Sequence, residues 1–299
     1  MLRSLLRLSL RVHGEQPMRR WKFVVRSVLY GASHRSWLDY LGRQAWLHRM
    51  VLLRPELVER LHRPYQCASF NRWARLGALQ AHYDVCAAIG WQALCLRMAR
   101  EALVLARLDA ARQPELRLEL GYDARFGKEG EWVLNLRSGS RRCYTMVLGF
   151  RKADSTHSLY IGCLQGPDGP ESREHVRELT RALHGERPRG LLLEAARELA
   201  AAAGCSHLEL VGDRQHIYRN LRKRRRLAFS YDHFAVELRA QPDGAQGWRL
   251  PLRAPERDLE DVASRKRAQT RRRRELLDAM RAQLRTQLRA ACAVAPRPR

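Results

Sequence analysis

The stretch Leu183-His-Gly-Glu-Arg-Pro-Arg-Gly-Leu-Leu-Leu-Glu-Ala196 decides how this chain is organised. Apolar residues recur there at helical spacing, Gly204 ends the helix, and Leu208-Glu-Leu-Val211 has the character of a strand. Upstream, a second helical pattern runs from about Glu171 to Leu183. The pattern therefore predicts a helix–turn–helix–strand unit, in which polar residues gather in the turns, where ligands are commonly bound.

The turn before the second helix has the composition of an anion-binding site. Pro188 suits the first turn of a helix, where its missing N–H would have had no partner. The turn has two sources of positive charge: the N-terminal end of the helix dipole and the arginines that flank the proline. We therefore predict a phosphate or diphosphate site formed by Gly185, Arg187, Arg189, Gly190 and Leu191. The alternative is that the glycines are ordinary turn residues and the arginines are only solvated.

Several further motifs occur in order over about half of the chain. They are Leu159-Tyr-Ile-Gly-Cys-Leu-Gln-Gly166, Leu179-Thr-Arg-Ala-Leu-His-Gly-Glu-Arg-Pro188, His216-Ile-Tyr-Arg219, Tyr231-Asp-His-Phe234, Trp248-Arg-Leu-Pro251 and Ser264-Arg-Lys-Arg-Ala268 followed by Arg271-Arg-Arg-Arg-Glu-Leu-Leu-Asp278. Together they resemble the VirK/YbjX family of bacterial proteins. Ala235 stands where that family has a tryptophan after Tyr-Asp-x-Phe, which puts in doubt any role for an aromatic there. The resemblance implies a context of virulence, outer-membrane remodelling and resistance to cationic antimicrobial peptides, without a defined reaction.

A second resemblance suggests a chemistry. Arg187-Pro-Arg-Gly190 is similar to the first part of the Arg-x-x-Gly-x-Gly/Ala turn with which GNAT acyltransferases hold the diphosphate of coenzyme A, although Leu192 replaces the third small residue. In that fold a strand and a short helix with Asn and Tyr follow, and Asp213 to Asn220 is placed to correspond. The resemblance implies an acyl-coenzyme A ligand. The helix from Glu171 to Leu183 is not part of that order.

Acyl transfer to an amine or hydroxyl needs a base for the acceptor and an acid for the leaving thiolate. Tyr218 is the candidate acid, and His216 or Asp213 is the candidate base. Glu129 and Glu131 are weaker acid–base candidates. The alternatives are that His216 caps the neighbouring turn and that Tyr218 is a half-buried aromatic with its hydroxyl in water.

The rest of the chain predicts an α+β fold with a helical N-terminal part, an antiparallel strand meander, a GNAT-like mixed core and a C-terminal amphipathic helix. Helical spacing persists from Glu56 to Ala106, and Phe229–Leu238 is predicted to return a strand to the sheet. Period-two patterns predict strands at Leu116–Leu120, Trp132–Leu136, Tyr144–Leu148 and Leu159–Leu164. The predicted units are a helical region at 1–110, the α+β core at 111–255, and a basic helix and tail at 256–299.

Composition limits the number of domains, the class of partner and the role of the cysteines. The chain has 299 residues, 45% of them apolar, which is enough to bury a core in one or two domains. A net charge of +25 ordinarily indicates nucleic acid or an anionic membrane, but its spread through an arginine-, alanine- and leucine-rich chain suggests coding bias. The seven cysteines are scattered without a Cys-x-x-Cys pair, so neither a disulfide framework nor a metal site is expected.

The N-terminal sequence bears on location. Arginines interrupt the apolar face of Met1–Val12, so no signal-peptide core is present, and no later window has the roughly 18 apolar residues of a spanning helix. We therefore expect a cytoplasmic protein. This amphipathic start and Trp21–Tyr30 are also suited to peripheral contact with the inner membrane, and the alternative is a helix docked on the fold or a frayed terminus.

Two basic runs, Arg219–Arg226 and Ser264–Arg274, would suit an anionic ligand such as coenzyme A, a lipid head group or nucleic acid. Nucleic acid ranks last because no recognition helix or aromatic platform is apparent. Three hypotheses result: a GNAT-like acyltransferase acting in envelope modification, a non-enzymatic envelope-stress or surface-export factor that binds an anionic partner or membrane, and a nucleic-acid-binding protein. The sequence does not indicate an oligomeric state.

Overall fold

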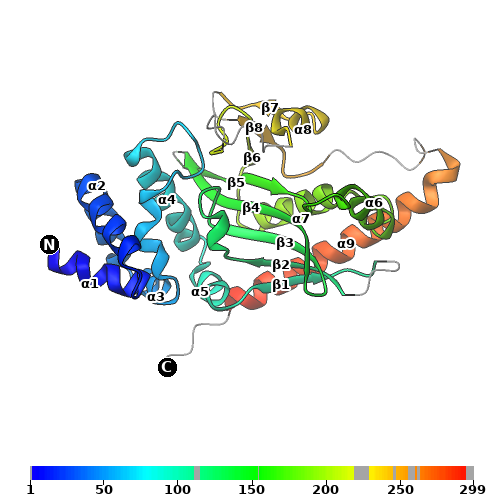
Figure 1. Ribbon diagram of the computed structural model, residues 1–299. Helices are drawn as coiled ribbons and strands as arrows, with labels where there is room; N and C mark the ends of the chain where they lie inside the picture. Colours follow the sequence, from blue (N-terminus) through cyan, green and yellow to red (C-terminus); the bar gives the residue numbers. More distant parts are fainter. Residues whose placement is uncertain are drawn as a thin grey trace.

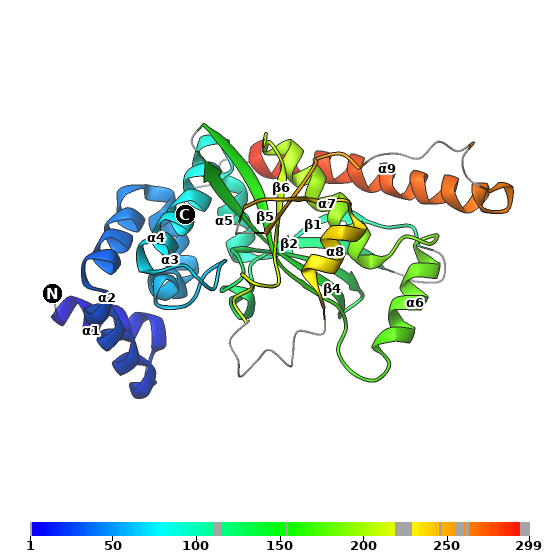
Figure 2. The same ribbon diagram turned by 90° about the horizontal axis from the view of Figure 1, so that it is seen from above.

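The computed structural model describes residues 2–110, 115–153, 155–218, 229–244, 247–254, 260 and 263–293. Helices from the N-terminal third lie beside one end of a twisted sheet, and a long C-terminal helix runs along the sheet's far side (Figures 1 and 2). This arrangement confirms the predicted α+β class with a helical N-terminal part and a C-terminal helix.

The helical part begins with an amphipathic helix packed on its neighbour. It comprises α1 (Leu2–His13), α2 (Pro17–Arg43), α3 (Ala45–Leu53), the 3-10 helix η1 (Pro55–His62), α4 (Arg72–Ala88) and α5 (Gln92–Arg100). Pro17 occupies the first turn of α2, and the Asn71 side chain caps α4 by accepting hydrogen bonds from the N–H groups of Trp73 and Ala74. Gly31, with φ of 46°, kinks α2.

The sheet follows the sequence order with one rearrangement. Its strands are β1 (Leu103–Arg107), β2 (Leu116–Gly121), β3 (Trp132–Ser138), β4 (Arg141–Ala153), β5 (Thr156–Gln165), β6 (Leu208–Val211), β7 (Gln241–Pro242) and β8 (Gly247–Leu250), with the short 3-10 helix η2 (Ala124–Phe126) after β2. In the described residues they form one sheet in the order β1-β2-β3-β4-β5-β6-β8-β7. Neighbouring strands are antiparallel except β5 and β6, whose parallel pairing requires a crossover connection.

The crossover consists of α6 (Ser172–Ala182) and α7 (Pro188–Ala202). α7 packs on β3, β4 and β5, and also contacts α9 (Ser264–Ala293). The apolar face of α9 is buried by these contacts and by others with β1 and α5. The C-terminal helix therefore docks on its own chain through the face that the sequence marked as apolar.

Two predictions of local structure were wrong. The helical pattern extended to Ala106, but residues from Leu103 form β1, because the sheet buries Leu103 and Leu105. Phe229–Leu238 was predicted as a strand, but the helix α8 (Tyr231–Glu237) forms there. Buried Tyr231, Phe234 and Ala235 recur at helical spacing, and Ser230 caps the helix. The aromatic residues of this segment give it a high strand propensity, but the Ser230 cap favours a helix.

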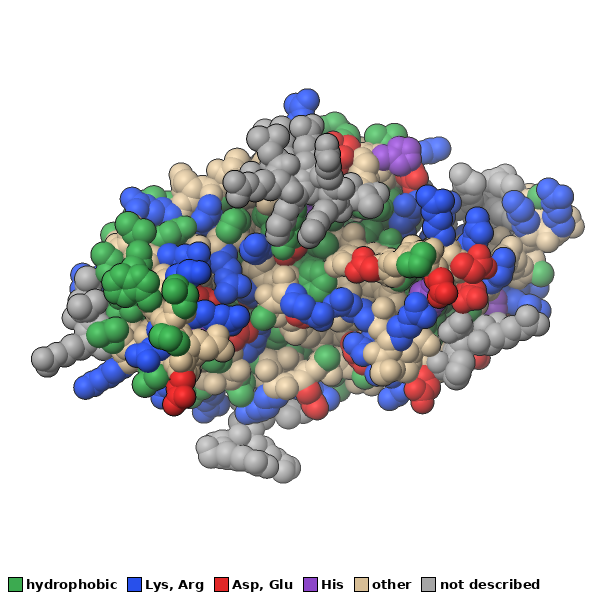
Figure 3. Space-filling model, viewed as in Figure 1, with side chains coloured by type: hydrophobic (Ala, Val, Ile, Leu, Met, Phe, Trp, Pro, Cys, Tyr) green, Lys and Arg blue, Asp and Glu red, His purple; other side chains and the backbone are tan. Residues whose placement is uncertain are grey.

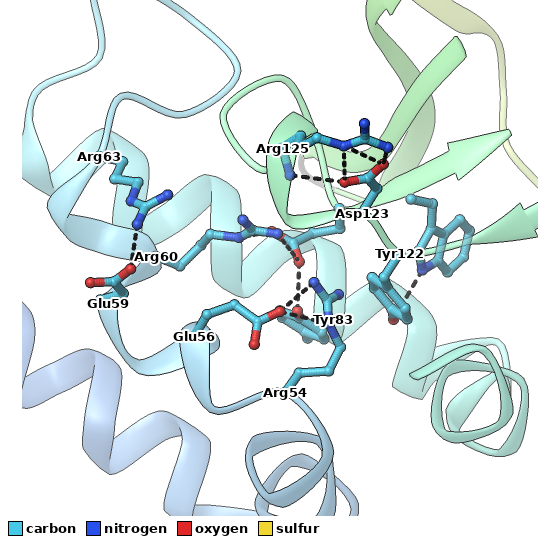
Figure 4. A network of polar contacts seen from close by, with 11 residues as sticks. Arg54, Glu56, Glu59, Arg60, Arg63, Tyr83, Tyr122, Asp123 and Arg125 are labelled. Atoms are coloured by element: carbon cyan, nitrogen blue, oxygen red, sulfur yellow. Dashed lines mark hydrogen bonds and ion pairs between the residues drawn. The ribbon is translucent and has the colours of Figure 1, made fainter. Parts of the chain in front are cut away.

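A buried ion pair links the helical part to the sheet (Figure 4). The Arg60 guanidinium on η1 donates to Glu131 through Nε at 3.0 Å, and the Tyr83 hydroxyl donates to the same carboxylate at 2.8 Å. Both charged side chains are almost fully buried. A Cβ at position 127 would collide with the Arg60 guanidinium, so Gly127 makes room for this contact.

Candidate active site

The two parallel strands separate at their carboxyl ends. Leu159–Ile161 of β5 pairs with Leu208–Leu210 of β6, whereas β5 continues to Gln165 paired only with β4. The separation begins at Gly162, an extra residue in the pairing of β4 with β5, which is a β-bulge. Bulges re-aim strands next to active sites, and the crevice outside the carboxyl ends of parallel strands is a common ligand site.

A loop before β3 packs tightly onto this bulge. A Cβ at Gly162 would collide with the carbonyl oxygen of Glu129, and a Cβ at Gly130 would collide with the carbonyl oxygen of Leu148. Both positions therefore require glycine for the close approach of backbone to backbone. The consequence is that the Glu129 side chain is placed beside the separated ends of β5 and β6.

Glu129 and Tyr218 form a hydrogen-bonded pair in this region. Glu129 is 3% exposed, and burial raises the pKa of its carboxyl to about 7. The Tyr218 hydroxyl is hydrogen-bonded to Glu129, and burial raises the pKa of Tyr218 to about 12. Among the residues that the structure describes, Glu129 Oε2 has no hydrogen-bond partner. A carboxyl group that titrates near neutral pH beside a tyrosine can accept and return a proton.

Tyr231 fills the space between the separated strands. Its hydroxyl accepts a hydrogen bond from the Leu164 N–H at 3.1 Å and is also hydrogen-bonded to the Cys163 thiol. Burial raises the pKa of Cys163 to about 12, so this thiol remains protonated and is a poor nucleophile. Sequence reasoning gave Tyr231 no role, because its contact with β5 joins residues that are far apart in the chain.

His216 lies against this cluster. Its ring stacks on Tyr231 with centroids 5.0 Å apart, and its Nδ1 accepts the Tyr218 N–H at 3.3 Å. Burial lowers the pKa of His216 to about 4, so the ring is neutral at physiological pH. The structure thus places His216 and Tyr218 side by side. It also places beside Tyr218 the weaker candidate Glu129, whose pKa is better matched to a base at neutral pH.

Asp213 is placed differently from the other two catalytic candidates. One carboxylate oxygen accepts from the Ser230 hydroxyl at 2.7 Å, and the other accepts from the Tyr231 N–H at 2.7 Å. The Asp213 N–H in turn donates to Asp232 at 3.1 Å. Both oxygens of Asp213 therefore hold the start of α8. This favours a structural role for Asp213 over a role in proton transfer.

Replacing Asp213 with alanine should lower the free energy of unfolding by about 2 kcal/mol, because the first turn of α8 loses two hydrogen bonds. Asp213→Asn keeps one acceptor oxygen and should cost less. Urea denaturation followed by circular dichroism measures both changes. Equal stability of the wild type and Asp213→Ala would show that these contacts do not hold α8.

The predicted anion site lies at the N-terminus of α7, but an acidic side chain shares it. The Glu186 carboxylate is so close to Gly190 that a Cβ there would collide with it, and it accepts a hydrogen bond from the Arg187 N–H. Arg187 is exposed, whereas Leu191 is fully buried and its N–H donates to the Arg187 carbonyl. Leu191 therefore contributes to the core rather than to an anion site. Gly185 turns the chain with φ of 88°.

Arg189 connects this turn to α8. Its guanidinium pairs with Glu237 at 2.6 Å and lies over the Phe234 ring, 4.9 Å from the ring centroid. Burial raises the pKa of Tyr144, and the positive charge of Arg189 opposes this rise. The Tyr144 ring lies against Gly166, the residue after β5. Arg189 and the cluster around Glu129 therefore both lie near the end of β5. The strand positions that they approach, Gly166 and Cys163, are three residue steps apart, or roughly 10 Å along the strand.

One group in the described chain has the composition of a metal site. His207, Glu209 and Asp243 lie within reach of a common ion. Arg151 already pairs with Glu209 at 2.8 Å, and Arg249 pairs with Asp243 at 3.1 Å. These ion pairs compete with a cation, so the group gives no support for a metal centre.

Part of the predicted ligand surface lies outside the described residues. This applies to the basic run Arg219–Arg226 and to Asn220. No helix in the described ranges has both the length and the apolar character required to cross a bilayer.

Comparison with known proteins identifies a matching family model and several similar bacterial proteins. A family model described as a protein of unknown function, DUF535, matches residues 13–286. The uncharacterized protein YbjX of Escherichia coli (strain K12) is 29% identical over 275 residues, covering 90% of this chain and 83% of that protein. An uncharacterized protein of Haemophilus influenzae is 31% identical over 213 residues, covering 71% of this chain and 70% of its own length. A membrane protein LapB of Mannheimia haemolytica is 38% identical over 80 residues, covering 27% of this chain and 35% of that protein. No solved structure matches significantly.

Proposed function

This chain belongs to the DUF535 family together with YbjX, as its VirK/YbjX resemblance indicated, and we propose that it transfers an acyl group from an acyl-coenzyme A in maintaining the bacterial envelope. The observation that carries the proposal is the hydrogen bond between buried Glu129 and half-buried Tyr218 beside the separated ends of β5 and β6. The envelope context comes from the resemblance to the family, and the name of the Mannheimia relative is consistent with it.

The order of elements supports a GNAT-like reaction. In this chain β5 leads through α7 to the parallel strand β6, and then through the short helix α8 to an antiparallel pair. The helix and the strand follow one another as the GNAT resemblance implied. Residues 213–218, where the resemblance placed the short helix, form turns, and α8 comes later in the chain. The inserted helix α6 is the departure from that order.

The residues present suit both proton transfers of an acyl transfer. As the acceptor nitrogen or oxygen attacks the thioester carbon, its proton would pass to ionised Glu129, either directly or through one water. The carbon–sulfur bond then breaks, and the Tyr218 hydroxyl would protonate the leaving thiolate. Protonated Glu129 would return a proton to Tyr218 through their hydrogen bond, which restores both groups.

The α7 turn fits a diphosphate only in part. Exposed Arg187 and the small Gly190 favour an anion, whereas Glu186 opposes one at the same helix end. Arg273 lies 3.9 Å from Glu186 and offsets some of its charge. Burial raises the pKa of Glu186, so the carboxylate is already disfavoured in this position. We propose that an incoming diphosphate displaces the Glu186 side chain or, through its negative charge, causes Glu186 to take up a proton from solvent.

Titration calorimetry with coenzyme A and acetyl-coenzyme A tests this proposal. The double change Arg187→Ala/Arg189→Ala should weaken binding about tenfold or more, because two charge-assisted contacts to phosphate are lost. Glu186→Gln should strengthen binding, because it removes an opposing charge. Arg177→Ala/Arg181→Ala on exposed positions of α6 removes the same charge elsewhere and should leave binding unchanged. Absence of binding in wild type and Glu186→Gln alike would overturn the acyl-coenzyme A assignment.

The second candidate is a non-enzymatic envelope-stress or surface-export factor that holds an anionic partner. The observation favouring it is that Glu186 occupies part of the predicted anion site while the surface remains strongly basic. Binding to anionic lipid without affinity for coenzyme A would favour this candidate. Nucleic-acid binding is the third candidate, and it predicts a steep salt dependence of affinity for DNA or RNA.

A further inference from the structure

An apolar stripe faces solvent on α2. Met18, Trp21, Val28 and Leu29 are all exposed, Trp21 to 65% and Leu29 to 68%. Their spacing of three, seven and one residues places them on one side of the helix, opposite the buried face that carries Phe23 and Ser27. Single exposed apolar residues are ordinary, but a row of large ones on one helix marks an interaction surface.

The start of α4 extends this surface. The Arg72 guanidinium donates to the carbonyl oxygen of Leu29 at 3.3 Å, which brings the two helices together. Trp73, the next residue, is 49% exposed. Figure 3 shows hydrophobic side chains gathered over α1 and α2 with lysine and arginine side chains beside them. Tryptophan is the residue type most typical of the boundary between lipid and water.

A row of cations runs along the flank of the apolar stripe. Arg19, Lys22 and Arg26 are exposed, lie three and four residues apart, and have no acidic partner among the described side chains. They line an open hollow of about 600 Å³, to which Arg63 and Arg125 also contribute. The acidic residues of the hollow are already paired, Glu59 with Arg63 and Glu56 with Arg54 at 2.7 Å. The hollow is therefore positive and suited to phosphate.

We infer that this face, made of the α2 stripe, Trp73 and the cationic row, rests on the surface of an anionic phospholipid bilayer. The apolar side chains would enter the boundary between head groups and acyl chains, while Arg19, Lys22 and Arg26 meet lipid phosphates at the hollow. The adjacency of apolar and cationic rows favours a lipid surface over a second copy of this chain, since a like-charged row would meet itself in a dimer. This surface does not depend on acyl transfer or on the α7 turn.

Sedimentation with vesicles tests the inference. The full-length protein should bind vesicles of phosphatidylcholine mixed with phosphatidylglycerol, bind phosphatidylcholine alone more weakly, and lose affinity as salt is raised. Arg19→Gln/Lys22→Gln/Arg26→Gln should weaken binding to the anionic vesicles tenfold to a hundredfold. Trp21→Ser/Leu29→Ser should also weaken binding, and the part of the affinity that it removes should persist at high salt.

Matched controls use the same substitutions elsewhere. Arg173→Gln/Arg177→Gln/Arg181→Gln removes three exposed charges from α6, and Leu52→Ser/Val236→Ser removes two exposed apolar side chains, so both should bind as the wild type does. Equal losses in the control and test variants would overturn the inference, because net charge alone would then explain binding. So would a wild-type dimer in light scattering that Trp21→Ser/Leu29→Ser converts to a monomer. Circular dichroism spectra confirm that each variant is folded.

Discussion

Glu131→Ala is expected to lower the free energy of unfolding by about 3–5 kcal/mol, because it leaves the Arg60 guanidinium buried without its counter-charge. Arg60 is 3% exposed and Glu131 is 1% exposed, so water cannot replace the lost carboxylate. The Tyr83 hydroxyl loses its acceptor as well. The same change removes the contact between η1 and the loop before β3, and should therefore loosen the helical part from the sheet.

Urea denaturation followed by tryptophan fluorescence measures this effect. The control is Glu119→Ala, which breaks a partly exposed pair with Arg117 and should cost at most about 1 kcal/mol. Replacement of both partners, Arg60→Met/Glu131→Met, should recover much of the loss because no unpaired charge remains. A loss below about 1 kcal/mol in Glu131→Ala would show that the pair contributes little to the fold.

The buried pair also predicts a dependence of stability on pH. The positive charge of Arg60 holds the pKa of Glu131 below its ordinary value despite burial. A carboxyl whose pKa is lower in the folded state stabilises the fold above its unfolded pKa, and this contribution is lost as the pH falls through the folded pKa. Stability should therefore fall in the acid range below the ordinary glutamate pKa.

Glu129→Gln is expected to reduce acyl transfer about a hundredfold to ten-thousandfold, the usual contribution of a general base. Because burial raises the pKa of Glu129 to about 7, the wild-type rate should rise with pH through that value as the carboxylate forms. The variant should lose this rise. Release of free thiol from acetyl-coenzyme A in the presence of a panel of amines measures the rate.

Glu129→Gln can also be tested without an acyl acceptor, through the pH dependence of the free energy of unfolding. A carboxyl whose pKa is raised on folding stabilises the protein below its unfolded pKa, and that stability is lost as the pH rises through the folded pKa. The contribution of Glu129 to the free energy of unfolding of the wild type should therefore decline between about pH 4 and 7. This decline should be absent in Glu129→Gln. Tyr218→Phe, which keeps the ring, serves as the companion variant and should raise the pKa of Glu129 further, because the hydrogen bond from the Tyr218 hydroxyl favours the ionised carboxylate. Full activity and an unchanged pH profile in Glu129→Gln would remove Glu129 from the reaction.

Local pattern was sufficient for most of the secondary structure. Alternation predicted the strands at Leu116–Leu120, Trp132–Leu136, Tyr144–Leu148 and Leu159–Leu164, because one-sided burial of a strand leaves a period of two in the sequence. Helical spacing with Pro188 at its start predicted α7 in the same way. The pattern failed at α8, where strand-forming aromatics compete with a helix cap that depends on Ser230 and Asp213.

The sequence by itself determined the α+β class, the family motifs, and the presence of His216 and Tyr218 near one another, since they are two residues apart. Only the tertiary structure decided that Glu129 lies against Tyr218, that Asp213 holds α8 and that Glu186 shares the α7 helix end. The physical reason is that secondary structure follows from the period of local burial, whereas a site forms where loops meet across a sheet. Glu129 reaches its place because glycines at 130 and 162 let two backbones approach closely, a contact that no local pattern records.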